Sequence, residues 1–340
     1  MKRKSFILLP LVITVAGLSL SGCSASSIPS PSVITPAPHP ALSEEKLADI
    51  NNSVFEVIAA ADSSLETEAL PSRLSGPALV ERRLQYQKKS LLGEATSLTS
   101  LSNKVKFSAI SQGDVYPRLV IEVTEAPEGE NLQMLNALVQ PTARHNWTLW
   151  GAMKILPASV APVVSTGETG AVTIQPDDSE GLVASPNAVV DAYVQLNKTR
   201  NDANGLTFAE DSFRARLARG QDRNAETVKD LGESTLDFAR GEQGPFSIRT
   251  EDGGALVIAE LDYTTAIRVT RIGGKASIPE NHDISIMATG EANKKLEFAG
   301  SATAYYTAAL AFYVPPADAE DTTITLIAAS DGAPHKVDVS

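Results

Sequence analysis

Hydrophobic residues recur at helical spacing near residue 43, ahead of a series of alternating segments. Ser43 can cap a helix there, and Glu44 and Glu45 suit its positive end. The apolar positions follow at steps of three and four: Leu47, Ile50, Val54, Ile58 and Ala61. The spacing predicts a helix with one apolar face.

A second helix is predicted from about Pro77, with Val80 and Leu84 facing inward and Arg82 and Arg83 outward. The hydrophobic period then shifts to two, which is typical of strands with one buried face. Four strands are predicted, over residues 105–111, 118–125, 134–140 and 147–155.

The same order of elements recurs after residue 185. Ser185 and Pro186 form a strong helix start, and Phe213 and Leu217 continue a second helix that Gly220 could end. Strands are then predicted over residues 246–250, 256–271, 302–314 and 323–329. This shared order, with local similarity of residues 119–121 to 256–258 and of 147–152 to 324–329, favours an internal duplication.

The strand that includes residues 257–269 alternates for so long that it should bend, because it exceeds the usual strand length. We therefore predict an α+β fold of two tandem domains, each with N-terminal helices packed on a curved antiparallel sheet. This layout resembles NTF2-like and cystatin-like domains. The expected boundaries are a first domain at 42–157, a linker at 158–184, and a second domain at 185–340 with an insertion near 272–300.

The N-terminus has the three parts of a secretion signal: the basic residues 2–4, an apolar stretch over 6–20, and small residues before Cys23. The apolar stretch is shorter than the roughly 20 residues that a membrane-spanning helix needs. Leu20, Ser21, Gly22 and Cys23 match the lipobox of bacterial lipoproteins. The resemblance implies a signal peptide over 1–22, cleavage after Gly22 and a lipid on Cys23, which would hold the chain on the extracytoplasmic face of the cell membrane.

Residues 23–41 are rich in serine and proline and are expected to form an extended tether, which at about 3 Å per residue could reach some 50–60 Å. A tether of this length favours a role near the cell wall. The chain has a formal net charge of −12, and loss of Lys2, Arg3 and Lys4 with the leader makes it more negative by three. An acidic surface argues against a nucleic-acid partner. Cys23 is the only cysteine, so we expect no intrachain disulfide. In layout and lipobox, most of the chain resembles uncharacterised α+β lipoproteins of actinobacterial envelopes.

Motifs for chemistry are weak. Residues 43–46 fit the Ser-x-x-Lys pattern of penicillin-interacting enzymes but are better explained as a helix cap, and the acidic residues 177–180 as a solvated linker. The four histidines are scattered, so no metal site is expected: His39, His145, His282 and His335. We expect no cofactor and assign no catalytic residue.

Two further candidates are carried by strands. Glu260 and Asp262 share one face at a separation compatible with glycosidase carboxylates, although the solvent face of a sheet explains them better. Trp147 and Trp150 could stack on a sugar ring, but their spacing points them to opposite faces, with one expected in the core and the other at the surface.

Three roles remain open. The favoured one is a non-catalytic, membrane-anchored lipoprotein that binds an envelope protein or a cell-wall polymer. The alternatives are a small-ligand carrier that uses the pocket between helix and sheet, and a hydrolase or isomerase in that pocket. An isolated carboxylate with a raised pKa in a deep pocket would favour catalysis, a wide dry pocket would favour carriage, and filled cores with an apolar surface patch would favour a protein partner.

Overall fold

The computed structural model describes residues 37–157, 159–164 and 167–340. The lipobox residues Leu20–Cys23 lie outside the described residues. Five α-helices are present in the described part: α1 (Glu44–Ser64), α2 (Gly76–Leu92), α3 (Pro186–Thr199), α4 (Ser212–Val228) and α5 (Asp283–Thr289). Within these same residues, no helix has both the length and the apolar character required to cross a bilayer.

Most of the strands belong to one 11-stranded sheet. They are β1 (Val105–Ile110), β2 (Arg118–Thr124), β3 (Met134–Gln140), β4 (Thr148–Ile155), β5 (Thr173–Ile174), β6 (Gly232–Arg240), β7 (Phe246–Arg249), β8 (Ala255–Val269), β11 (Ser301–Val314), β12 (Thr325–Ala329) and β13 (Ala333–Val339). Two short strands, β9 (Ala276–Ile278) and β10 (Leu296–Phe298), pair separately.

The order of strands in the large sheet is β1-β2-β3-β4-β12-β11-β8-β7-β5, with β13 paired to β11 and β6 paired to β8. All of these pairings are antiparallel. The long strands β8 and β11 pair with each other along 14 positions, and each takes different neighbours at its two ends. The two halves of the chain meet where β12 pairs with β4, through Ala328–Ile155 and Ala329–Lys154.

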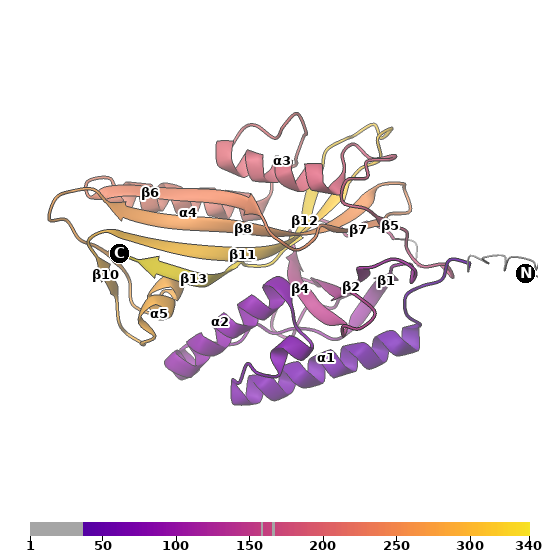
Figure 1. Ribbon diagram of the computed structural model, residues 1–340, viewed down its shortest axis with the longest axis horizontal. Helices are drawn as coiled ribbons and strands as arrows, with labels where there is room; N and C mark the ends of the chain where they lie inside the picture. The colour runs from indigo at the N-terminus through magenta and orange to yellow at the C-terminus, as the bar shows by residue number, and fades with distance from the viewer. Residues whose placement is uncertain (1–36, 158, 165–166) are drawn as a thin grey trace, which may run out of the picture. The chain divides into compact units, whose positions relative to one another are not determined.

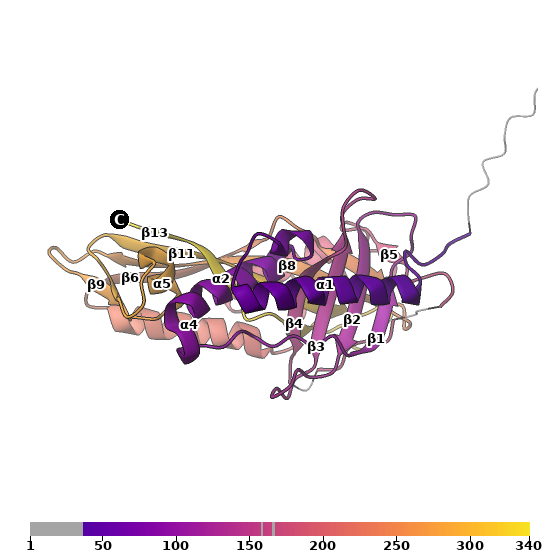
Figure 2. The same cartoon turned by 90° about the horizontal axis from the view of Figure 1, so that it is seen from below.

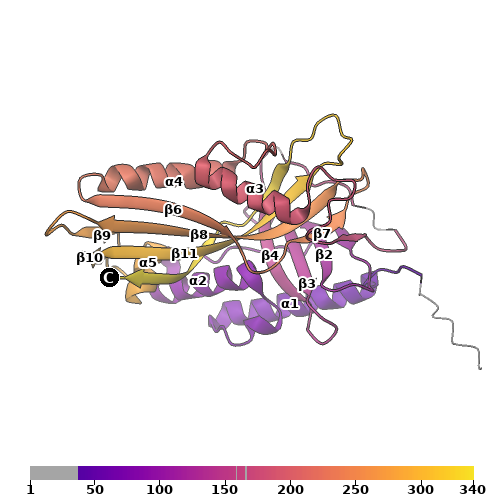
Figure 3. The same cartoon turned by 45° about the horizontal axis from the view of Figure 1, so that its top comes forward.

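The half of the sheet formed by β1–β4 packs face to face on the half that contains β8 and β11, with α1 and α2 outside the first half and α3 and α4 outside the second (Figure 1). One core lies between the halves and joins β1–β4 to β7, β8, β11 and β12. A second core lies between α1, α2 and the outer face of β1–β4, where α1 crosses the strands in Figure 2. A third core lies between α3, α4 and the other half, with α4 running beside β6 in Figure 3. The four layers are thus helices, sheet, sheet and helices.

Most of the predicted elements are confirmed. Ser43 caps α1 by accepting a hydrogen bond from the Lys46 amide at 3.3 Å, and Ser185 caps α3 through the Ala188 amide at 3.3 Å. The predicted strands match β1–β4, β7, β8, β11 and β12 within a few residues. β6 and β13 were not predicted because they contain few apolar residues, so that neither shows a clear apolar face in the sequence.

Two local predictions are wrong. Gly220 does not end α4, which continues to Val228. Arg82 does not face outward: its side chain is buried in a polar network between α1 and α2. Gly220 lacks the positive φ with which a glycine usually ends a helix. Arg82 was predicted to be exposed because its side chain is charged.

The α+β class with a large antiparallel sheet is confirmed, whereas the two tandem NTF2-like or cystatin-like domains are not. Residues 37–340 form one compact unit, and a single sheet runs through both halves. Residues 39–41, placed in the tether by sequence, form backbone hydrogen bonds with the sheet edge, from Ala41 to Ser111 at 2.8 Å and from Gly113 to His39 at 2.9 Å. Residues 272–300, the predicted insertion, contain β9, α5 and β10 around a small core.

Candidate functional site

A cleft lies beside the β4–β12 junction, between α2 and the turn that joins β12 to β13. We call it the Glu81 cleft. Its volume is about 200 Å³. Apolar walls come from both layers of the first half: Leu74, Ala78, Leu84, Leu101, Met134 and Leu149. Glu81 lies on the α2 face that lines the cleft, one turn beyond Ala78, and Ser330 and Gly332 of the β12–β13 turn lie close to its carboxylate.

Burial raises the pKa of Glu81 from 4.5 to about 7. The nearby Asp331 carboxylate raises the pKa further, whereas hydrogen bonds from the Ser330 hydroxyl and the Gly332 amide, and the charge of the Lys154 ammonium group, lower it. The Gly332 amide donates to Glu81 Oε1 at 3.2 Å. The carboxyl group is thus divided between its charged and neutral forms near pH 7, which is unusual for a glutamate.

The cations around this cleft are already paired. Lys154 Nζ lies 3.1 Å from Asp331, and Lys88 Nζ lies 2.7 Å from Asp283. Among the residues that the structure describes, Glu81 forms no ion pair of its own. The cleft therefore contains one carboxylate without a cation in direct contact.

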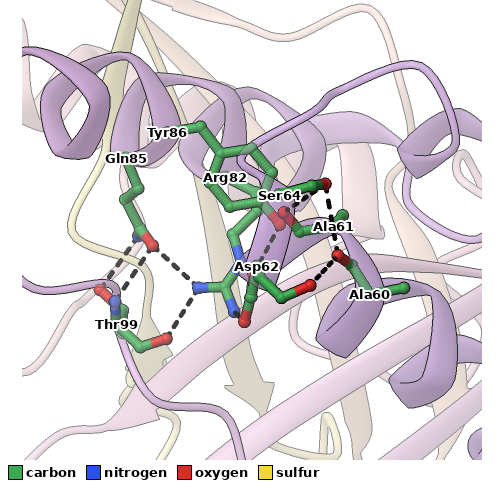
Figure 4. A network of polar contacts seen from close by, with 9 residues as sticks. Ala60, Ala61, Asp62, Ser64, Arg82, Gln85, Tyr86 and Thr99 are labelled. Carbon is green, nitrogen blue, oxygen red and sulfur yellow. Dashed lines mark hydrogen bonds and ion pairs between the residues drawn. The ribbon is translucent and has the colours of Figure 1, made fainter.

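A buried network holds α2 in place beside Glu81 (Figure 4). Arg82 Nη2 donates to Asp62 Oδ2 at 2.7 Å, and Arg82 Nη1 donates to the Thr99 carbonyl at 2.8 Å and to Gln85 Oε1 at 2.9 Å. The Tyr86 hydroxyl donates to Asp62 Oδ1 at 2.5 Å. These contacts tie α1, α2 and the segment before β1 together, and so fix the wall of the Glu81 cleft.

A second and wider depression of about 680 Å³ lies at the opposite end of the α2–β4 contact. We call it the Trp150 groove. Rings form its walls: Pro71, Pro117, Pro141, Trp150 and Phe246. The rim carries polar side chains from the β3–β4 and β6–β7 connections: Arg144, His145, Asn146 and Gln243.

The groove joins the two halves of the sheet through aromatic and amide contacts. Trp150 packs edge to face on Phe246 with ring centroids 5.2 Å apart, and its indole nitrogen donates to Gln243 Oε1 at 2.8 Å. Gly76, at the start of α2, lies so close to the indole that a Cβ there would be 2.4 Å from Trp150 Nε1. The positive φ of 52° at Gly76 also favours glycine.

Glu260 and Asp262 lie on one face of β8, as predicted, but that face is partly covered and not simply solvated. Thr307 donates to Glu260 Oε1 at 2.9 Å, and the Gln243 amide donates to Glu260 Oε2 at 3.0 Å. Burial raises the pKa of both carboxyl groups. Glu260 thus supports the β6–β7 connection from behind the Trp150 groove.

The histidines and the two sequence motifs have local structural roles. His282 caps α5 by accepting from the Ile284 amide at 3.2 Å, and His145 contacts Thr142 Oγ1 at 2.8 Å at the groove rim. Within residues 37–157, 159–164 and 167–340, no three His, Cys, Asp or Glu side chains are grouped to hold a metal. Ser43 caps α1, and Asp177 accepts from Asn187 at 2.7 Å beside α3.

Both tryptophans are buried, so the prediction that one would be at the surface is wrong. Trp147 is 5% exposed and belongs to the core under α1 and α2, whereas Trp150 is 1% exposed and belongs to the core between the sheet halves. The prediction of opposite faces is confirmed. Sequence analysis also missed Glu81, although its place three residues from both Ala78 and Leu84 put a charge on an apolar stripe.

A family model described as "Domain of unknown function (DUF8094)" matches residues 39–329. No curated protein and no solved structure matches the chain.

Proposed function

The chain belongs to the DUF8094 family of domains of unknown function, and we propose that this member is an extracytoplasmic lipoprotein that binds a cell-wall polymer without catalysing a reaction. In this proposal a lipid on Cys23 holds the protein on the cell membrane, and residues 23–38 act as the tether. The lipobox residues Leu20, Ser21, Gly22 and Cys23 support the anchoring part.

The Trp150 groove is the observation that carries the binding part. Its volume of about 680 Å³ and its walls of proline and aromatic rings suit an elongated ligand with cyclic apolar surfaces. The amide, guanidinium and imidazole groups of the rim can hydrogen-bond to hydroxyl and amide groups of such a ligand. A wall polymer is favoured over a free small ligand because the groove is open and the expected tether has the reach.

The binding part is tested by filling the groove. Ser72 is exposed in the groove, and Ser72→Phe places a ring there at the cost of one hydrogen bond to the Ala69 carbonyl. Ser90→Phe is the matched control, because Ser90 is exposed on α2 and donates to the Gln87 carbonyl in the same way. Sedimentation of the full chain with purified cell walls should show affinity at least tenfold lower for Ser72→Phe and unchanged for Ser90→Phe.

If both variants bind cell walls as tightly as the unaltered chain, the Trp150 groove is not the binding site. If the unaltered chain binds an envelope protein and no wall polymer, the protein-partner alternative takes its place. The anchoring part is tested separately, by intact-mass analysis of the protein from its native membrane beside a Cys23→Ala variant. A free thiol at Cys23 with the leader still attached would refute the anchor.

A second candidate is acid–base catalysis, and the raised pKa of Glu81 favours it. A general acid or base works best with a pKa near the working pH, and Glu81 has a pKa of about 7. Wall fragments incubated with the protein should then gain products that mass spectrometry detects, and Glu81→Gln should abolish them. An apolar-ligand carrier is less well supported, because both cavities have charged or polar groups at their walls.

A further inference from the structure

We propose that the Glu81 cleft is a binding site for a primary ammonium group on a short aliphatic chain. The site is separate from the Trp150 groove and does not depend on the function proposed for it. Three features support this site: a carboxylate without a cation in direct contact, apolar side chains in the wall, and a volume of about 200 Å³.

The charge balance selects a cation. Lys154 and Lys88 each lie within 3.1 Å of a carboxylate, and Arg82 is held by Asp62 at 2.7 Å. An entering anion would therefore have to displace an existing partner. An entering ammonium group would instead meet Glu81, which lies near Lys154 but has no cation in direct contact among the described residues, since Lys154 is paired with Asp331.

Part of the wall suits an aliphatic chain. The side chains of Leu74, Leu84 and Leu149 line the cleft, together with polar side chains that include Thr99 and Ser330. The volume of about 200 Å³ is close to that of engineered apolar cavities that hold benzene, about 150 Å³. A chain of about four carbons that ends in an ammonium group therefore fits, whereas a polymer does not.

Binding of this kind must depend on pH through Glu81. Burial raises its pKa to about 7, so below pH 7 the group is mostly neutral and attracts an ammonium group weakly. The ionisable groups around Glu81 come from α2, β4, β8, α5 and the β12–β13 turn: Arg82, Lys88, Lys154, Tyr263, Asp283 and Asp331. Glu81, with its pKa of about 7, therefore carries the expected pH dependence.

The test uses n-butylammonium as the probe and the full chain in detergent micelles, by calorimetry at constant ionic strength. For a pKa of about 7, affinity should rise about tenfold from pH 6 to pH 8, because the charged fraction of Glu81 rises by that factor. The neutral probe n-butanol should bind with no such dependence. Glu81→Gln should weaken n-butylammonium binding at least tenfold at pH 8 and remove the pH dependence, whereas the exposed control Glu45→Gln should change neither.

Equal affinity of the unaltered chain and Glu81→Gln for n-butylammonium would overturn the proposal, as would equal affinity at pH 6 and pH 8. The unaltered chain alone provides a second test that needs no variant. At pH 7 binding should release about half a proton, seen as a heat that depends on the ionisation enthalpy of the buffer. Binding without proton release would also overturn it.

Discussion

The Glu81 cleft and the Trp150 groove lie at opposite ends of the same contact between α2 and β4, yet they differ in volume and in the chemistry of their linings. The cleft has about 200 Å³ and a buried carboxyl group, whereas the groove has about 680 Å³ and rings with an uncharged or basic rim. Glu81 sets the character of the cleft, whereas the proline rings and the polar rim set that of the groove, because Trp150 is only 1% exposed.

The difference shows that two sites with different binding chemistry can form beside one contact between a helix and a strand. In the cleft, partial burial makes the charged form of Glu81 less favourable than in water, and an entering cation would stabilise that form. In the groove, the indole nitrogen is already satisfied by Gln243 at 2.8 Å, so recognition there relies on shape and on rim hydrogen bonds. The cleft should respond to pH between 5 and 8 through Glu81, whose pKa is about 7.

The largest effect is expected for Arg82→Met. This change leaves Asp62 and the Tyr86 hydroxyl without their shared cation, and removal of one partner of a buried ion pair costs about 3 kcal/mol. Asp62 keeps partial contact with solvent, so we expect the low end of that range. Urea unfolding at pH 7 measures it. A loss below about 0.5 kcal/mol would mean that the network does not hold the cleft wall.

Glu81→Gln should stabilise the fold at pH 8. Because the folded pKa of about 7 lies above the unfolded value of 4.5, the contribution of Glu81 to stability is fully present below pH 4.5 and is lost as pH rises toward 7. Glutamine mimics the neutral form and avoids this loss, which amounts to about 2 to 3 kcal/mol. Unfolding midpoints of both proteins at pH 5 and pH 8 measure this difference. If Glu81→Gln is no more stable than the unaltered chain at pH 8, burial does not raise the pKa of Glu81.

Gly76→Ala is the corresponding change at the groove. A methyl group there would overlap the Trp150 indole, and the φ of 52° is unfavourable for alanine, so we expect a loss of about 2 kcal/mol. The size of the loss should not vary between pH 5 and pH 8, in contrast to the cleft. Gly93→Ala serves as the control, since its φ is 55° but no atom lies within 4 Å of the added carbon.

The smallest effect is expected for Lys46→Ala on the exposed surface of α1. Its pair with Asp49 at 3.2 Å is solvated on both sides, and such pairs contribute about 0.5 kcal/mol or less. A thermal melt at 0.15 M salt should place this variant within error of the unaltered chain. A larger loss of stability would mean that the exposed pair of Lys46 and Asp49 contributes more than such surface pairs usually do.

Sequence periodicity predicted most elements because each has one apolar face. Ser43 and Ser185 mark helix starts through backbone hydrogen bonds that depend on local residues alone. The joining of the two halves could not be predicted, because the β4–β12 pairing brings together Lys154 and Ala329, which are far apart in the chain. The same holds for both cavities: Glu81 meets Gly332 and Trp150 meets Gln243 only after the sheet has formed.

The division of roles between the two cavities is tested most directly by one crossed measurement. Ser72→Phe and Glu81→Gln are each assayed for binding to purified cell walls and to n-butylammonium at pH 8. The account predicts that Ser72→Phe loses wall binding and keeps n-butylammonium binding, and that Glu81→Gln shows the reverse. Loss of wall binding in Glu81→Gln, with wall binding retained in Ser72→Phe, would contradict it.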